Sequence, residues 1–350
     1  MKKAISFCFF FLLGSILYSQ QASKKYSIRT IAFYNLENLF DTINDPKIND
    51  EASPMMELKR NKSEVYWDKI DKLGFVISQI GITKTKTSPA IIGVSEIENR
   101  KVLEDLVNSK HLREKKYEII HYDSPSLRGI DVALLYQPRY FTPIHHEVFN
   151  PNIFKNGKKI FTRDQLLVSG YLDEELIHLI VNHWPSRRGG EKKSRLLRER
   201  AAYQNVKIID QIFQKDGLSK ILLIGDFNDD PTNSSFKKVL KTKEDKRLLK
   251  PKDIYNPYEK LYKKGYNSSG YRDNINLFDQ ILMSASFVAS NRKEYANFKF
   301  FQAKIFNKGF LITKEGRYKG YPFRSFSYGK YIGGYSDHYP VYVYLIKEQK

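Results

Sequence analysis

The sequence between residues 221 and 228 is ILLIGDFN, so an apolar run leads directly into Asp226 and Asn228. A continuous apolar run of this kind is typical of a β-strand that is covered on both faces. The polar residues follow where the strand ends, and they therefore face the edge of a sheet. The stretch predicts a buried strand that presents a carboxylate and an amide at one edge.

The same arrangement recurs along the chain. A single Asp or Asn after a strand usually begins a turn or caps a helix, but here acidic, amide and imidazole groups occur together at six such places. Because strand ends in one sheet lie close together, we expect these side chains to converge on one pocket. The other five places are Asn35–Asn38, Glu96, Asn182–His183, Asp279 and Ser336–His338.

Strand-like runs are spread over the whole chain, with helical patterns between them. Some runs follow one another directly and others are separated by a helix, which favours a mixed α/β body with two packed sheets flanked by helices. The predicted strands are Ile28–Asn35, Ala90–Ser95, Tyr117–Tyr122, Asp131–Tyr136, Leu166–Tyr171, Ile177–His183, Ile221–Gly225, Phe278–Met283 and Val341–Leu345.

Three helices are predicted from apolar residues at helical spacing, over about 65–80, 102–107 and 191–213. In the third, we expect Leu196 and Phe213 on one apolar side and the cations from Lys192 to Arg200 on a solvated face. The stretches 42–62 and 244–272 lack periodicity and are expected to be long surface loops. No linker or repeat divides the chain, so a single domain over 27–347 is predicted.

The N-terminus has the pattern of an export signal. Lys2 and Lys3 precede an uncharged apolar run from Ala4 to Leu17, and polar sequence follows at once. We therefore expect residues 1–20 to be a cleaved signal peptide and the protein to be secreted or periplasmic, with no stable membrane span after cleavage. A retained membrane anchor is the alternative.

Composition narrows the possible chemistry. The only cysteine, Cys8, lies in the expected signal, so a disulfide framework and a thiolate metal site are excluded from the mature chain. Carboxylate and amide oxygens suit a hard cation, and Mg²⁺ is expected, with Mn²⁺ or Ca²⁺ as alternatives. The net charge is +20, and +18 without the two lysines of residues 1–20. Such a basic surface attracts polyanions, although solubility alone is an alternative reason for it.

Taken in order, the motifs resemble those of the endonuclease/exonuclease/phosphatase superfamily. They are Asn-x-Glu from Asn35, Ser-Glu at Glu96, Asn-His at His183, Gly-Asp-Phe-Asn at Asp226, and the pair Asp-Gln-Ile and Ser-Asp-His-Tyr-Pro-Val near the C-terminus. The resemblance covers nearly all of the mature chain. It implies an α+β fold, a four-layer sandwich of two mixed sheets flanked by helices, and a metal-dependent phosphoric ester hydrolase.

The resemblance also implies roles for individual residues. Glu96 matches the principal metal ligand, with Asn35, Glu37 and Asp337 beside it. Asp226 and Asn228 match the pair that orients the nucleophile, and Asp279 matches the residue that orients His338, the base or phosphate contact. His183 is expected to protonate the leaving group. The remaining candidates are Asp131, which could orient His183 or begin a turn, and the phosphate-binding residues Arg163, Asn182, Arg187 and Arg188.

Three functions remain open on the sequence. The leading expectation is an exported, monomeric nuclease that hydrolyses DNA or RNA phosphodiester bonds by metal-assisted attack of water. A sphingomyelinase-like phospholipid phosphodiesterase, or a phosphatase of small phosphorylated compounds, is the first alternative. A non-catalytic binding protein on the same scaffold is the second, and the intact set of acids and histidines argues against it.

Overall fold

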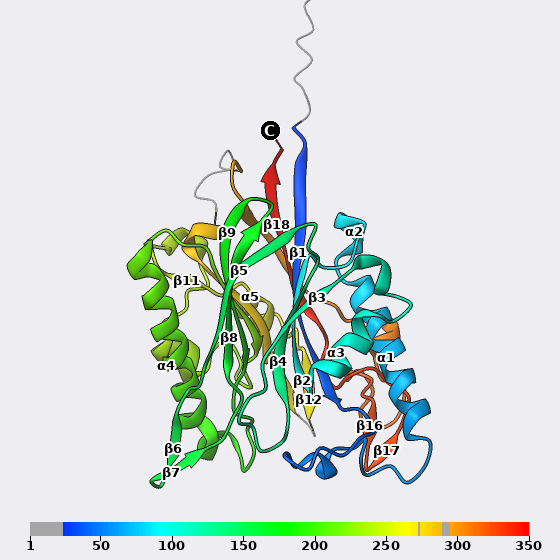
Figure 1. The fold of residues 1–350 in the computed structure, drawn as a ribbon. Helices are drawn as coiled ribbons and strands as arrows, with labels where there is room; N and C mark the ends of the chain where they lie inside the picture. Colours follow the sequence, from blue (N-terminus) through cyan, green and yellow to red (C-terminus); the bar gives the residue numbers. More distant parts are fainter. Residues whose placement is uncertain (1–23, 272–273, 289–294, 350) are drawn as a thin grey trace, which may run out of the picture.

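A computed structural model describes residues 24–271, 274–288 and 295–349 (Figure 1). Two six-stranded sheets pack face to face, and helices cover both outer faces. The expected α+β sandwich of two mixed sheets is therefore confirmed. The expected signal peptide at residues 1–20 lies outside the described residues. Within the described residues, no helix is both long and apolar enough to span a membrane.

The two sheets have the same pattern of strand directions. In each sheet a parallel pair lies at the centre, β1/β2 in one and β9/β10 in the other, and the remaining neighbours are antiparallel. The first sheet has the order β15(Lys299–Ile305), β18(Val341–Glu348), β1(Tyr26–Leu39), β2(Ile91–Ile97), β4(Asp131–Tyr136), β3(Glu118–His121). The second has the order β11(Ile254–Tyr255), β14(Asp279–Ser284), β10(Ile221–Asp226), β9(Glu175–His183), β8(Gln165–Leu172), β5(Phe141–Phe149).

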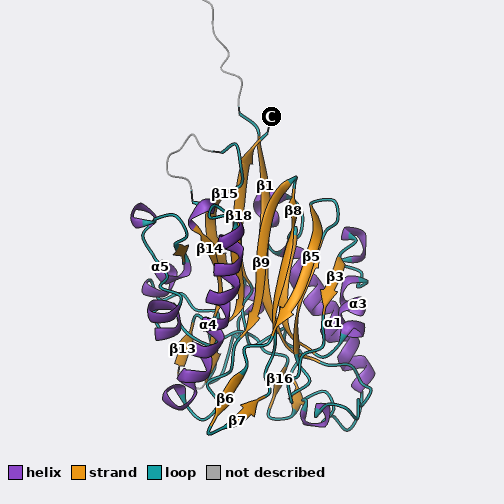
Figure 2. Cartoon of the chain, turned by 60° about the vertical axis from the view of Figure 1, so that its left-hand side comes forward, coloured by secondary structure: helices purple, strands orange, loops and turns teal. Residues whose placement is uncertain are grey.

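Alternating strand residues explain the layers. Ile31, Phe33, Leu222 and Ile224 face the core between the sheets, while Ala32 and Tyr34 face the helices on one outer side. Figure 2 shows the sheets between the helical layers. On the first sheet lie α1(Lys62–Gln79), α2(Ile82–Thr85) and α3(Arg100–Val107), and the second is covered by α4(Glu191–Lys215), with α5(Tyr258–Lys263) nearby. Short hairpins are β6(Ile153–Lys155)/β7(Lys158–Ile160), β12(Ser269–Tyr271)/β13(Asn274–Asn276) and β16(Phe326–Ser327)/β17(Lys330–Tyr331).

The edge strands β5 and β15 were not predicted. Most of β5 is exposed, it contains Pro143, and its register shifts between Pro143 and His145. An edge strand packs on few neighbours and therefore lacks the two-sided apolar pattern by which the central strands are recognised. The predicted loop over 244–272 likewise contains β11, α5 and β12.

The expected faces of the third helix are wrong at two positions. Leu196 is 70% exposed, whereas Arg198 is fully buried within α4. Arg198 donates from Nε to Asp229 Oδ1 at 2.6 Å, and Asp229 also accepts from Ser235 Oγ at 2.7 Å. A buried arginine is tolerated here because its charge is paired and hydrogen-bonded. The pair fastens α4 to the segment that follows Asp226.

We predict that Gly225→Ala destabilises the fold. A Cβ at this position would lie 2.4 Å from the Asn182 carbonyl oxygen on the neighbouring strand, and this backbone atom cannot rotate away. The loss in unfolding free energy, measured by urea denaturation, should be about 1–3 kcal/mol. Gly309→Ala is the control, since no atom lies within 4 Å of its added Cβ. Equal urea midpoints for Gly225→Ala and wild type would contradict this account.

Candidate active site

The strand directions bring the polar strand ends together. Because β1/β2 and β9/β10 are parallel pairs, their carboxyl ends place Asn35, Glu96, His183 and Asp226 at one edge of the sandwich. The antiparallel strands β14 and β18 begin at that same edge, so they contribute residues from their amino ends. The expected convergence of strand-end side chains is therefore found, and it draws on both sheets.

Unusual backbone conformations accompany these residues. Glu37, Asn38, Glu96 and Asn228 all have a positive φ, between 47° and 57°, which non-glycine residues rarely adopt. The β1/β2 register shifts between Asn35 and Leu39, and the β2/β4 register shifts around Glu96. Such bulges re-aim side chains at a sheet edge, and strained residues cluster at functional sites.

Asp226 lies at the centre of the site and is almost fully buried. Its Oδ2 accepts a hydrogen bond from Asn35 Nδ2 at 3.1 Å, and its Oδ1 accepts one from the Asn228 backbone N–H at 2.9 Å. The same Oδ2 lies 3.6 Å from His183 Nε2 and 3.9 Å from His338 Nε2. Burial raises the pKa of Asp226, and the charge of His338 opposes that rise.

His338 is held by the expected aspartate. Asp279 Oδ2 lies 2.7 Å from His338 Nδ1 and also accepts from Ser268 Oγ at 2.6 Å, so the imidazole presents Nε2 to Asp226. Burial acts against a charged imidazole, but Asp279 and Asp226 outweigh it and raise the pKa of His338 well above its usual value. The two carboxylates therefore favour the charged form of His338.

The pKa of His183 is shifted in the opposite direction to that of His338. Burial lowers the pKa of His183 well below its usual value, and the positive charges of Arg163 and Arg128 act in the same direction. Its Nε2 lies 3.8 Å from Glu96 Oε1. Burial and the two arginines therefore disfavour protonation of this imidazole.

The possible pairing of Asp131 with His183 is not found. Asp131 Oδ2 lies 3.1 Å from His121 Nε2, and its Oδ1 accepts from the Ser124 backbone N–H at 2.9 Å. Both oxygens are therefore used within β3, β4 and the loop between them. Among the described residues, His183 Nδ1 is a buried atom with no hydrogen-bond partner.

Three of the four expected metal ligands bind neighbouring groups of the protein. Glu37 accepts from the Ser325 backbone N–H at 2.6 Å and lies 3.3 Å from Arg324 Nε, while Asp337 binds Arg324 through Oδ2 at 3.0 Å. The Asn35 side-chain amide donates a hydrogen bond to Asp226, and its oxygen accepts one from the Glu37 backbone N–H. The side-chain oxygens of Glu37 and Asn35 thus all have partners within the protein.

Glu96, the fourth expected ligand, accepts few hydrogen bonds. Its Oε2 accepts one hydrogen bond, from the Asn38 backbone N–H at 3.1 Å. Its Oε1 lies 3.7 Å from Arg128 and 3.8 Å from His183, which is too long for a direct hydrogen bond. A carboxylate with this freedom, in a site that offers oxygen and imidazole donors, fits a hard divalent cation.

Two other groups of side chains also bring possible ligand atoms together. In each group the atoms lie within 4.8 Å of one another. One group is Asp226, Asp279 and His338, and the other is His121, Asp123 and Asp131.

Three expected phosphate-binding residues lie elsewhere or act structurally. Asn182 is fully buried and bonds the Trp184 indole N–H and the Ile180 carbonyl. Arg187 donates to the Asn228 carbonyl and to side chains of the following loop, so it positions that loop. Arg188 is exposed on the surface.

Arg163, in contrast, lies within the site. It is buried and donates from Nη2 to the Trp184 carbonyl at 2.6 Å, and the same carbonyl accepts from Asn228 Nδ2. Burial lowers the pKa of Arg163 to about 10, so it remains charged at neutral pH. The cations Arg128 and Arg324 also belong to the site, and both lie in irregular segments that gave no sequence signal.

The sequence model described as the Endonuclease/Exonuclease/phosphatase family matches residues 30–347. The chain belongs to this family. Its members are metal-dependent phosphoric ester hydrolases, so this protein is an enzyme of that class. No curated protein sequence matches the chain.

Solved structures share the family fold at low sequence identity. A D. rerio TDP2 complexed with a single-strand DNA product is 13% identical, covers 91% of this chain and 99% of its own, and has a TM-score of 0.53. A Bacteroides thetaiotaomicron mannosyl-6-phosphatase is 18% identical, with coverage of 91% and 99% and a TM-score of 0.52. The human Nocturnin catalytic domain is 13% identical, with coverage of 93% and 98% and a TM-score of 0.51.

We predict that Asp279→Asn lowers the pKa of His338, because a carboxylate that stabilises the imidazolium is lost. The imidazole should then lose its proton at a lower pH than in the wild type, as followed by NMR in EDTA. His338→Ala should reduce turnover by about 10²–10⁴-fold, and Asp279→Asn by less. Asp253→Asn, which alters a carboxylate beside β11, is the control. Unchanged titration and full activity in Asp279→Asn would exclude the pairing.

Proposed function

We propose that this family member is an exported phosphodiesterase that hydrolyses nucleic acid with the help of a divalent cation. The observation that carries the proposal is the grouping of two imidazole nitrogens, 3.6 and 3.9 Å from one buried oxygen of Asp226. Hydrolysis of a phosphodiester requires one proton to leave the attacking water and another to reach the departing oxygen. A carboxylate between two imidazoles in different charge states can serve both transfers.

The charge states suggest how the two histidines divide the work. His338 is protonated at rest, so it can bind the anionic phosphate and donate a proton through Nε2. His183 is neutral and lies beside Asp226, so it can accept the proton of the attacking water. This assignment reverses the acid role that the sequence led us to expect for His183, and it rests on the burial and charges around each ring.

Glu96 is proposed to hold the cation, because its Oε1 has no direct hydrogen bond and lies near His183 and Arg128. A bound Mg²⁺ would neutralise charge on the phosphate oxygens. Arg163 and Arg128 lie close enough to influence His183, and they supply fixed positive charge for the same phosphate. Asn35 and Asn228 hold Asp226 in place through hydrogen bonds that do not add negative charge.

Nucleic acid is preferred as the substrate on the basis of charge. The expected mature chain carries a net charge of +18, and a polyanion gains more from such a surface than a compound with one phosphate. The DNA product bound to the similar TDP2 structure is consistent with this preference. Export is supported by the charged and apolar pattern of residues 1–20.

We predict that Glu96→Gln removes most activity and that EDTA stops the wild type. The test uses single-stranded DNA, duplex DNA, RNA, sphingomyelin and mannose 6-phosphate, each with Mg²⁺, Mn²⁺ or Ca²⁺. Glu114→Gln, which changes an exposed carboxylate, is the charge-matched control. Full activity in excess EDTA would exclude the cation, and turnover of the lipid or sugar phosphate alone would exclude nucleic acid as the substrate.

The proton assignment gives a separate prediction. An alkoxide leaving group needs a proton, whereas p-nitrophenolate is a stable anion and needs little help. His338→Asn should therefore impair cleavage of an alkyl phosphodiester about 10-fold or more beyond its effect on a p-nitrophenyl diester. His183→Asn should impair both substrates to a similar degree. The reverse pattern would make His183 the acid.

A further inference from the structure

A cavity of about 310 Å³ opens beside the active site and shares residues with it. Asp337, which precedes His338, lines the cavity, and so does Arg324. A main-chain bridge between Ser269 and His338 joins the opposite wall to the site, because Gly270 directly follows that bridge. A group bound in the cavity would therefore lie next to the phosphate that is attacked.

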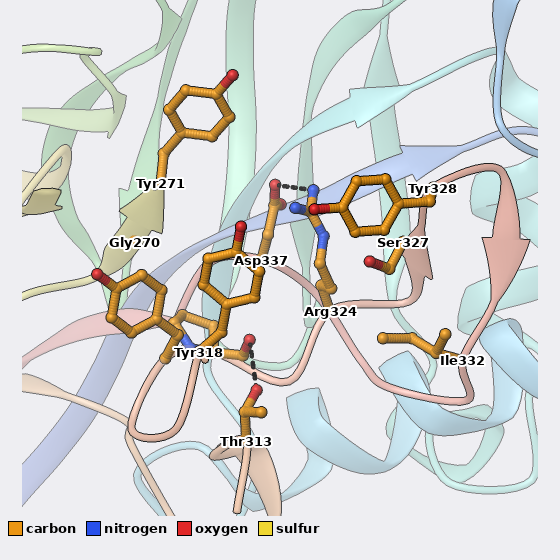
Figure 3. A pocket seen from close by; sticks show the side chains of 11 residues that line it. Gly270, Tyr271, Thr313, Tyr318, Arg324, Ser327, Tyr328, Ile332 and Asp337 are labelled. Carbon is orange, nitrogen blue, oxygen red and sulfur yellow. Dashed lines mark hydrogen bonds and ion pairs between the residues drawn. The ribbon is translucent and has the colours of Figure 1, made fainter. Parts of the chain in front are cut away.

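Tyrosine side chains form much of the cavity wall. Figure 3 shows Tyr271, Tyr318 and Tyr328 arranged around the ion pair of Arg324 and Asp337. The rings of Tyr318 and Tyr321 lie 5.7 Å apart at an interplanar angle of 43°. These rings come from three separate segments, namely β12, the loop over 313–322 and the β16/β17 hairpin.

One wall depends on a glycine. A Cβ at Gly270 would lie 2.4 Å from the ring of Tyr321, so this ring packs directly on the main chain of β12. The close approach fixes one flat surface of the cavity next to the bridge with His338.

Among these residues, Tyr328 has the most unusual combination of exposure and backbone conformation. It is 89% exposed and has a φ of 49°, and Gly329 follows with a φ of 69°. Two successive positive φ values at a hairpin turn favour Asn, Asp or Gly at the first position. Burial in the protein does not account for a large ring at this strained position.

The charges argue against a second phosphate in the cavity. The guanidinium of Arg324 is bound by Glu37 at 3.3 Å and by Asp337 at 3.0 Å. Because Arg324 is already paired with two carboxylates, its guanidinium is not free to bind an anion in the cavity. An uncharged, flat group suits such a wall better, because it can stack on tyrosine rings without competing for the arginine.

We propose that this cavity binds an unpaired nucleobase adjoining the scissile phosphate. The inference rests on the proposed function and specifies its substrate as a strand whose bases are accessible. An aromatic base stacks well on tyrosine and tolerates any sequence, since every base has a π-face. The hydroxyl groups of Thr313 and Ser327 in the lining favour a base over an acyl chain.

The decisive comparison uses a single-stranded oligonucleotide and the same strand with abasic sugars in place of the bases. The wild type should prefer the base-containing strand in kcat/KM. Tyr328→Ala should reduce that preference about 5- to 150-fold, the range that stacking of one base supplies, while Tyr328→Phe should retain it. Tyr203→Ala, which changes an exposed tyrosine on α4, should also retain it. An unchanged preference in Tyr328→Ala would overturn the proposal.

Binding in EDTA separates this inference from the proposed function. A base-containing strand should bind the wild type more tightly than the abasic strand, and Tyr328→Ala should lose that difference even though no cleavage takes place. If the enzyme cleaves neither strand but this binding difference is present, the hydrolytic function fails and the base site stands. If cleavage occurs but neither assay distinguishes the two strands, the base site fails and the hydrolytic function stands.

Discussion

Burial of the Asp226 carboxylate is the constraint around which the site is organised. A buried carboxylate is costly unless hydrogen bonds and opposite charge surround it. Here the Asn35 side chain and the Asn228 backbone donate to it, and the charged imidazole of His338 lies nearby. Each of these groups depends in turn on a partner, such as Asp279 for His338, so the polar groups form one connected set.

The backbone contributes to the same arrangement. Four non-glycine residues at positive φ lie at the polar ends of β1, β2 and β10, and such conformations cost on the order of 1–3 kcal/mol each. The fold can bear this cost because the strands behind them pack in continuous apolar layers on both faces. The buried pair of Arg198 and Asp229 adds a second anchor, which holds the segment after Asp226 against α4.

The sequence predicts the central strands and most of the side chains that meet in the candidate site, but not the loops. β2 and β10 are recognisable because burial on both faces produces a continuous apolar run, whereas the exposed edge strand β5 has no such pattern. Asn182 is fully buried and Arg187 bonds the Asn228 carbonyl, and proximity to His183 along the chain does not indicate such contacts. Arg128 and Arg324 contact Glu96 and Glu37 across 32 and 287 residues, which no local pattern encodes.

The order in which the chain forms its sheets has a consequence for biosynthesis. The second sheet is built from the middle of the chain, residues 141–284, while the first combines β1 to β4 with β15 and β18. β1 pairs with β18 from Tyr26↔Glu348 to Phe33↔Val341, and the loop just before β18 carries His338. The site therefore stays incomplete while the ribosome is still translating residues up to about 348. A nascent chain has no complete catalytic centre, and hydrolytic capacity arises only as the first and last strands meet.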